Sequence, residues 1–198
     1  MAKTVSRRVR PAEGNESDRT KLIIAGSIGV GLLILGVLLY LAIRPEPGLE
    51  GLVNYGRLQT NQHDADIEYE YGALPPYGGV HNPLWQQCGI YDTPIQSEYA
   101  IHSLEHGVVW LTYQEDLSAE DVEYLAEHAR GQSHMLMSPY PNQQSPVVLT
   151  AWGLQMEVES LPDDRIERFI QQYQQGPQTP ERGASCGGAN AVGDPVEQ

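Results

Sequence analysis

Lysine is nearly absent from this chain, and cysteine is scarce. Both lysines, Lys3 and Lys21, lie in the first 21 of the 198 residues. A Schiff base, a lysine general base and a P-loop each require a lysine, so these chemistries are excluded from the rest of the chain. The sequence also lacks a G-x-S-x-G motif, which gives no support to a serine hydrolase. The acidic run 63–70 lacks the glycine and the ligand order of a calcium-binding loop.

Positive charge is scarce as well. The chain has 12 Lys+Arg against 26 Asp+Glu, which gives a formal net charge of −14 at pH 7. Phosphate binding requires a basic surface, so this composition argues against nucleic acid as a partner. The charge is unevenly distributed, because residues 1–21 carry +3 and residues 22–198 carry −17.

An uncharged apolar run of 22 residues, 22–43, separates these two parts. As a helix rising about 1.5 Å per residue it spans roughly 33 Å, which is enough to cross a bilayer core of about 30 Å. The run is longer than the apolar core of a cleaved signal peptide, and a poor cleavage site follows it. We expect a single-pass transmembrane helix in the cell membrane. By the positive-inside rule, the basic tail 1–21 is then cytoplasmic and residues 44–198 are extracytoplasmic.

The expected extracytoplasmic part divides into three segments by composition. Residues 44–70 contain prolines and an acidic run without a sustained period, which is typical of a stalk and an extended entry segment. Residues 71–175 have the length of one ordinary domain. Residues 176–198 form a tail rich in proline and glycine. Within the domain, residues 71–97 read as a long loop containing His, Trp, Cys and Tyr, and loops of this kind are often functional.

The second half of the domain shows clear periodicity. Short runs rich in β-branched or alternating apolar residues predict strands. Ser118, with Asp121 three residues later, predicts the start of a helix that ends by Gly131, and a last helix is predicted from about Pro162 to Gly176. The predicted strands cover residues 108–113, 134–138, 147–152 and 154–159. This order indicates an α+β domain with a mostly antiparallel sheet and helices on one face.

The sharpest motif is His102-Ser-Leu-Glu105-His106, which has the spacing H-x-x-E-H. Residues four apart share one face of a helix, so the two imidazoles could converge on one ion, with Glu105 beside them. In the inverted zincin form of this motif, the histidines hold zinc and the glutamate acts as the general base. The alternative is a short helix ending at Gly107, with His106 near its negative end and Glu105 in a surface ion pair.

Further candidate donors lie outside this motif. His81 follows a Gly-Gly turn, and Met135 and Met137 alternate on a predicted strand. Histidine with methionine suits copper, whereas histidine with glutamate suits zinc. The alternatives are that His81 makes a hydrogen bond within its loop and that the methionines fill the core. His63 is expected to be solvated.

The two cysteines, Cys88 and Cys186, both lie in the expected extracytoplasmic part. An even pair outside the cytoplasm predicts a disulfide, which here would tie the tail to the loop at 71–97. The alternative is a free Cys88 thiolate acting as a copper ligand or as a nucleophile.

A set of short motifs, in order along roughly residues 70–188, resembles the family of uncharacterised proteins called DUF3105. The motifs are Pro75-Pro-Tyr-Gly-Gly-Val-His81-Asn-Pro-Leu-Trp85, Cys88-Gly-Ile-Tyr91, His102-Ser-Leu-Glu-His-Gly107, Ser138-Pro-Tyr-Pro141, Leu149-Thr-Ala-Trp-Gly153 and the segment from Gly176 to Cys186. The resemblance implies an exported, often membrane-anchored bacterial domain, and it supplies no activity. The recurring residues that it implies are His81, Cys88, His102, Glu105, His106 and Cys186.

The leading hypothesis is a membrane-anchored extracytoplasmic protein that binds copper or zinc, for metal carriage or an accessory role. Its predicted ligands are His81, His102 and His106 with Met137 as a fourth donor, while Glu105 orients a histidine by a hydrogen bond. One alternative is a zinc-dependent hydrolase that uses Glu105 as its base. Another is a non-catalytic subunit or assembly factor of a membrane complex, with other membrane proteins as partners. We favour a binding protein over an enzyme.

Overall fold

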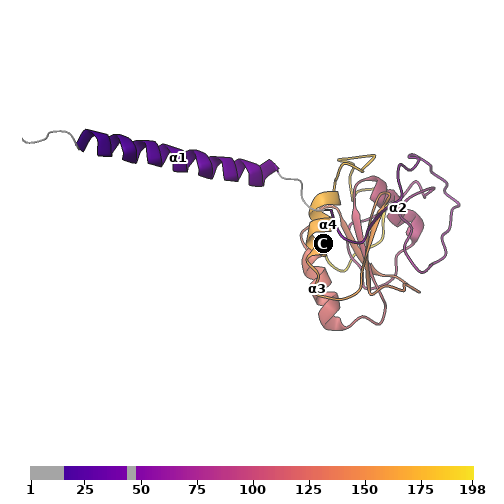
Figure 1. The fold of residues 1–198 in the computed structure, drawn as a ribbon. Coiled ribbons are helices and arrows are strands. Elements are labelled where there is room, and N and C mark those ends of the chain that lie inside the picture. The colour runs from indigo at the N-terminus through magenta and orange to yellow at the C-terminus, as the bar shows by residue number, and fades with distance from the viewer. Residues whose placement is uncertain (1–15, 44–47) are drawn as a thin grey trace, which may run out of the picture. The chain divides into compact units, whose positions relative to one another are not determined.

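The computed structural model describes residues 16–43 and 48–198. The chain divides into two units at Pro47 and Gly48, and each is described by itself (Figure 1). Residues 1–15, most of the predicted basic tail, lie outside the described residues, as do residues 44–47 at the start of the predicted stalk.

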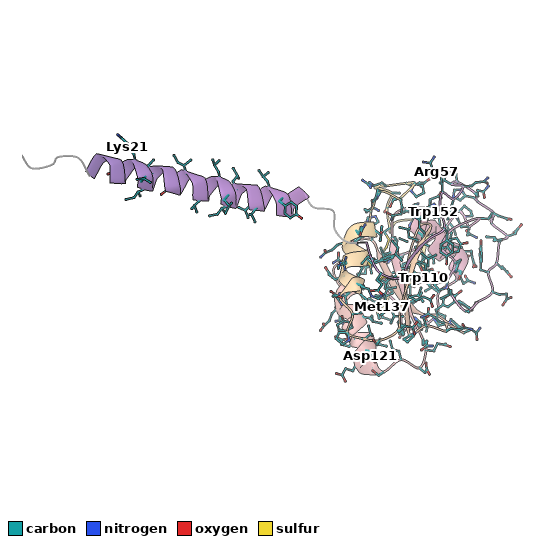
Figure 2. The ribbon with its side chains drawn as sticks, viewed as in Figure 1. Lys21, Arg57, Trp110, Asp121, Met137 and Trp152 are labelled. Atoms are coloured by element: carbon teal, nitrogen blue, oxygen red, sulfur yellow. A yellow bond between two sulfur atoms is a disulfide. The ribbon has the colours of Figure 1, made fainter. Side chains whose placement is uncertain are left out.

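The first unit contains helix α1 (Glu16–Ile43). Its segment Thr20–Tyr40 has a mean hydropathy of 2.7 and buries none of its residues. Apolar side chains project from the helix along its length beyond Lys21 (Figure 2). The hydroxyl of Ser27 donates to the carbonyl of Ile23 at 2.9 Å, so this polar group is satisfied within the helix. By length and composition, α1 is able to cross a membrane.

The second unit is built on a six-stranded mixed sheet with strand order β1-β7-β6-β4-β5-β3. Neighbouring strands are antiparallel from β1 to β4, whereas β4, β5 and β3 run parallel. The strands are β1 (Leu52–Asn54), β3 (Gly89–Ile90), β4 (Val109–Tyr113), β5 (Met135–Pro139), β6 (Val147–Ala151) and β7 (Leu154–Val158). The α+β class is confirmed, but the sheet is mixed because helix α3 (Ala119–Ala129) crosses over between β4 and β5 and makes them parallel.

Helices cover both faces of this sheet (Figure 1). Along β4, Val109 and Leu111 belong to a core shared with α3 and α4 (Arg165–Tyr173), whereas Trp110 belongs to a second core on the opposite face. Helix α2 (Ser97–Glu105) packs into that second core. The prediction of helices on one face therefore holds for α3 and α4 only.

The predicted helix signals are confirmed where periodicity was clear. The Ser118 hydroxyl accepts the N–H of Asp121 at 3.1 Å and caps α3. The predicted last helix is α4, and its buried residues are Ile166, Phe169, Ile170 and Tyr173.

The compact unit extends beyond residues 71–175 in both directions. Strand β1 pairs with β7 at one edge of the sheet, and β8 (Ala191–Val192) in the tail pairs with β2 (Trp85–Gln86). The predicted disulfide between Cys88 and Cys186 is present, with Cα atoms 5.4 Å apart. The tail is therefore held against the loop that precedes α2.

Candidate metal centre

Helix α2 presents its two histidines and its glutamate at one end of the second core. Ile101 and Leu104 are completely buried in this core, while His102 and His106 lie one turn apart on another side of the helix. The helix ends at Glu105 and His106 caps it, and Gly107 follows with a φ of +94°, a conformation that favours glycine. A Cβ there would lie 2.6 Å from Nε2 of Gln175 and 2.8 Å from Cγ2 of Thr179, so the following segment packs closely at this point.

Two loop segments run side by side next to α2 and bring two more histidines together. The backbone N–H of His81 donates to the carbonyl of Gln62, and the N–H of Asp64 donates to the carbonyl of His81, both at 2.9 Å. These bonds form a parallel bridge between His63 and His81. His63 is exposed as predicted, yet its ring lies 4.8 Å from that of His81 and 4.9 Å from that of His102, measured between centroids.

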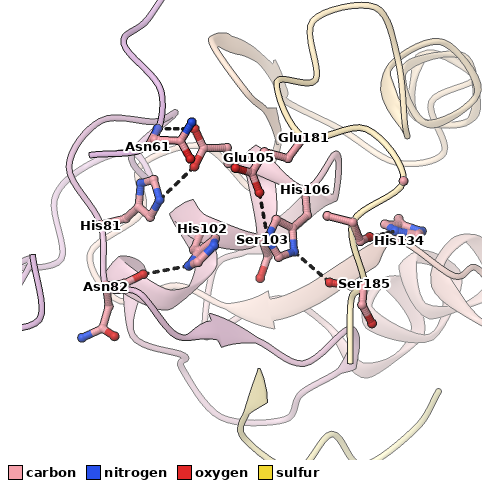
Figure 3. Close-up of polar contacts among 12 residues, drawn as sticks. Asn61, His81, Asn82, His102, Ser103, Glu105, His106, His134, Glu181 and Ser185 are labelled. Carbon is pink, nitrogen blue, oxygen red and sulfur yellow. Dashed lines mark hydrogen bonds and ion pairs between the residues drawn. The ribbon is translucent and has the colours of Figure 1, made fainter. Parts of the chain in front are cut away.

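Backbone carbonyls fix the orientation of three imidazole rings, and Figure 3 shows the bonds of His102 and His106. Nδ1 of His81 bonds to the carbonyl of Gly79, Nδ1 of His102 to that of Asn82, and Nδ1 of His106 to that of Ser185, each at 2.8 Å. A carbonyl oxygen only accepts, so each Nδ1 carries the proton and donates it. In a neutral ring, Nε2 then carries the lone pair that binds a metal.

Four donors form what we call the inner group: His63, His81, His102 and Glu105. One donor atom from each lies within 4.8 Å of the donor atoms of the others. The side chains of His81 and Glu105 have 0% exposure, so these two donors are fully removed from water.

Glu105 faces the second ring nitrogen of His81. Its Oε1 accepts the backbone N–H of Asn61 at 2.9 Å, and its Oε2 lies 3.0 Å from Nε2 of His81. This close contact is not aligned as a hydrogen bond, and among the described residues neither atom has a hydrogen-bond partner. Two buried polar atoms at this distance are satisfied only by a proton on Nε2 or by a metal cation between them.

Burial sets the charges of these groups. It lowers the pKa of the His102 imidazole to about 4, although the bond to the Asn82 carbonyl opposes this shift. Burial also lowers the pKa of His106. For Glu105, burial raises the pKa, but the His81 ring and the Asn61 N–H outweigh it, so the pKa of this carboxyl lies below its usual value. The imidazoles of His102 and His106 are therefore neutral and Glu105 is a carboxylate at neutral pH, which are the forms that bind metals.

A second set of donors, which we call the outer group, consists of His102, His106 and Glu181. Nε2 of His106 lies 3.5 Å from Oε2 of Glu181, whose side chain is 34% exposed. Glu181 belongs to a segment, the strap (residues 181–186), that crosses the end of α2. The N–H of Glu181 donates to the carbonyl of Glu105 at 3.0 Å. The N–H of Cys88 donates to the carbonyl of Cys186, also at 3.0 Å.

The structure brings together three of the four predicted ligands, His81, His102 and His106. Met137 is not among them, because it is fully buried with Met135 in the core on the opposite face of the sheet. This is the face that α3 and α4 cover, so the alternative that the methionines fill the core is the correct one.

The structure also describes the surroundings of Glu105 and Cys88. Glu105 is expected to orient a histidine, and its Oε2 lies 3.0 Å from Nε2 of His81, while the Gly79 carbonyl holds Nδ1 of the same ring. Cys88 is bonded to Cys186, so the alternative of a free Cys88 thiolate is wrong.

Sequence reasoning missed His63 and Glu181. His63 lies in an acidic run that reads as solvated surface, and only the pairing of two loops places it beside His81. Glu181 could have been predicted from its position five residues before Cys186. The expected disulfide places this part of the tail near the loop at 71–97.

The fold and the site together define a mixed-sheet α+β domain with a cluster of histidines and carboxylates, most of them buried, at one end of a short helix. The model of the family described as "Protein of unknown function (DUF3105)" matches residues 62–188, and the chain belongs to this family, as the motifs predicted. The match includes every donor of the inner and outer groups. Comparison with curated proteins and with solved structures gave no match.

Proposed function

We propose that this protein is a membrane-anchored, extracytoplasmic metal-binding protein whose centre is the inner group. The observation that carries this proposal is the arrangement of Nε2 of His81 and Oε2 of Glu105, two buried atoms that face each other without a hydrogen bond. The carbonyl bonds to Nδ1 of His81 and His102 support it, because ligating histidines usually have their second nitrogen held in this way.

The donors favour zinc or divalent copper. Three imidazoles and one carboxylate are nitrogen and oxygen ligands, which suit both ions, whereas monovalent copper prefers sulfur. With Met137 on the other face of the sheet, the inner group contains no sulfur. Four protein donors also match the closed coordination of sites that hold an ion and do not turn over a substrate.

The hydrolase alternative receives less support from the same geometry. A general base needs access to a metal-bound water and to the substrate. The Glu105 side chain is fully buried, one oxygen accepts the Asn61 N–H, and the other faces His81. We therefore propose binding or carriage of the ion as the function.

The proposed location depends on α1 and on the disulfide. The apolar segment Thr20–Tyr40 supports an anchor, and a Cys88–Cys186 bond fits an oxidising compartment outside the cytoplasm.

The proposal predicts that the full-length protein, purified in mild detergent and dialysed, retains about one zinc or copper ion per chain, as a closed four-ligand site would. The variant His102→Ala should lose most of this ion, because it removes a donor of the centre. Elemental analysis together with a protein assay measures the stoichiometry.

The matched control is His128→Ala, since His128 pairs with Glu167 on the opposite face of the sheet and should leave the ion bound. Circular dichroism shows whether each variant is folded. A folded wild-type chain that takes up neither zinc nor copper after reconstitution would contradict the proposal.

A further inference from the structure

The inner and outer groups share one residue, His102. Because Nδ1 of His102 donates to the Asn82 carbonyl, only Nε2 is available to bind an ion. His102 can therefore serve an ion in the inner group or an ion in the outer group, but not both at once. The two groups are alternative positions for a single ion.

The donors form a continuous row between these positions. Ring centroids are 4.8 Å apart for His81 and His102 and 4.7 Å apart for His102 and His106. Glu181 follows at 3.5 Å from Nε2 of His106. An ion held by His102 can therefore gain a ligand on one side before it loses a ligand on the other, so it need not pass through a state without protein ligands.

The two ends of the row differ in the number of protein donors that they offer. In the inner group, the exposed His63 supplies the fourth donor, so an ion bound there has four protein ligands. The outer group has three protein donors, and its Glu181 side chain is 34% exposed, so it leaves a coordination position for water or for the ligand of another molecule. The outer group is the end at which an ion can be exchanged.

We propose, resting on the proposed function, that the outer group is a transfer position through which the ion enters and leaves the inner group. A hydrated or chelated divalent ion first binds to Glu181 and His106. It then bonds to His102 and moves to His81, Glu105 and His63. Release follows the same steps in reverse. No bond other than metal–ligand bonds forms or breaks, and the charge of the ion does not change.

The test measures exchange kinetics in the full-length protein in detergent, with Zn²⁺ as the ion and a fluorescent chelator as the competitor in stopped-flow mixing. The variant Glu181→Gln keeps the size of the side chain and removes its charge. We expect loading and release to slow by the same factor, about tenfold or more, while one ion still binds with nearly unchanged equilibrium affinity. Glu127→Gln, at an exposed site on α3, is the matched control and should change neither rate.

Glu105→Gln separates the two positions, because it should weaken equilibrium affinity by about 10- to 100-fold. Unchanged loading and release in Glu181→Gln would overturn the transfer position and leave the proposed function standing. Two Zn²⁺ ions bound per wild-type chain would also overturn it, since His102 would not then be shared. A wild-type chain that binds no ion would overturn the proposed function and this inference with it.

Discussion

At the scale of single residues, the centre depends on what each side chain faces. Nδ1 of His81, His102 and His106 all donate to backbone carbonyls, so the peptide chain itself determines which nitrogen remains for a metal. A substitution leaves a backbone carbonyl in place. It can therefore change the orientation of these rings only by moving the backbone at Gly79, Asn82 or Ser185.

Met137 provides a direct test of the proposed ligand set. The variant Met137→Leu conserves volume in a fully buried position, so it should cost less than about 1.5 kcal/mol of folding stability. Because Met137 lies on the far face of the sheet, the stoichiometry and affinity for zinc or copper should not change. Urea unfolding and elemental analysis measure these two quantities, and loss of the ion in a stable variant would restore Met137 as a ligand.

Gly107 is the residue at which α2 turns toward β4. An alanine there combines an unfavourable φ of +94° with a Cβ only 2.6 Å from Gln175. We expect Gly107→Ala to destabilise the fold by about 2–4 kcal/mol, from backbone strain together with overpacking. Gly131 is the matched control, because its φ is +71° and a Cβ would meet nothing within 4 Å. Gly131→Ala should therefore cost only about 1 kcal/mol in urea unfolding, and equal losses in the two variants would contradict the role of packing.

Much of the centre could be predicted at this scale, and the rest could not for definite reasons. His102, Glu105 and His106 share one helical segment, so their spacing alone predicts that they lie together. His81 could be added because of the Gly-Gly turn before it. His63 could not, because its place depends on two backbone bonds between loops that have no period. The function of Glu105 depends on the direction of its carboxylate, which spacing does not determine.

At the scale of elements, the strand and helix signals of the second half of the domain predicted β4 to β7, α3 and α4 closely. The predicted arrangement of these elements was wrong in part, because the sheet is mixed and helices cover both of its faces. A strand, a helix and a strand in succession favour parallel pairing, and β4, α3 and β5 follow this rule. The later strands are joined by short connections and pair in antiparallel fashion. The sequence does not predict that α2 lies on the sheet face opposite α3 and α4. Irregular loops, which have no periodic pattern, cover most of that face.

The strap, residues 181–186, is the element that links the disulfide to the centre. It supplies the Ser185 carbonyl to His106 and carries Glu181. Closing a loop of 98 residues gives about 4–5 kcal/mol of stability in the chain-entropy model, so the double variant Cys88→Ser with Cys186→Ser should lose up to this amount. The same variant should also exchange its ion at an altered rate, because Glu181 and Ser185 lose their anchor.

Thermal unfolding and chelator competition measure these effects, with reduced and alkylated wild-type protein as the comparison. A variant that exchanges its ion as the wild type does would show that the strap keeps its place without the disulfide.

At the scale of the whole molecule, the chain joins an apolar helix to a strongly acidic domain. Residues 22–198 carry −17, and the charges of this part lie beyond the apolar run. Acidic surfaces raise the local concentration of cations and the rate at which they arrive, without selecting among them. In the proposed function, the donors of the inner group then determine which cation is bound.

This organisation predicts how the protein fractionates. The full-length chain should remain with membranes through washes at high salt and at alkaline pH, because an apolar helix is held by the bilayer and not by charge. A chain lacking residues 22–43 should appear in the soluble fraction. Immunoblots of the two fractions measure this, and release of the full-length chain by salt alone would contradict an integral anchor.

The donors of the two groups are contributed by segments far apart along the chain, from His63 in the first loops to Glu181 near the C-terminus. A chain that is exported from its N-terminus onward presents these segments one after another, and no early fragment contains a complete centre. Binding that occurs only in the folded state also stabilises that state, by about 4 kcal/mol when the ion is present at a thousand times its dissociation constant. Acquisition of the ion would therefore be the last step of maturation, and it would distinguish finished molecules from incomplete ones.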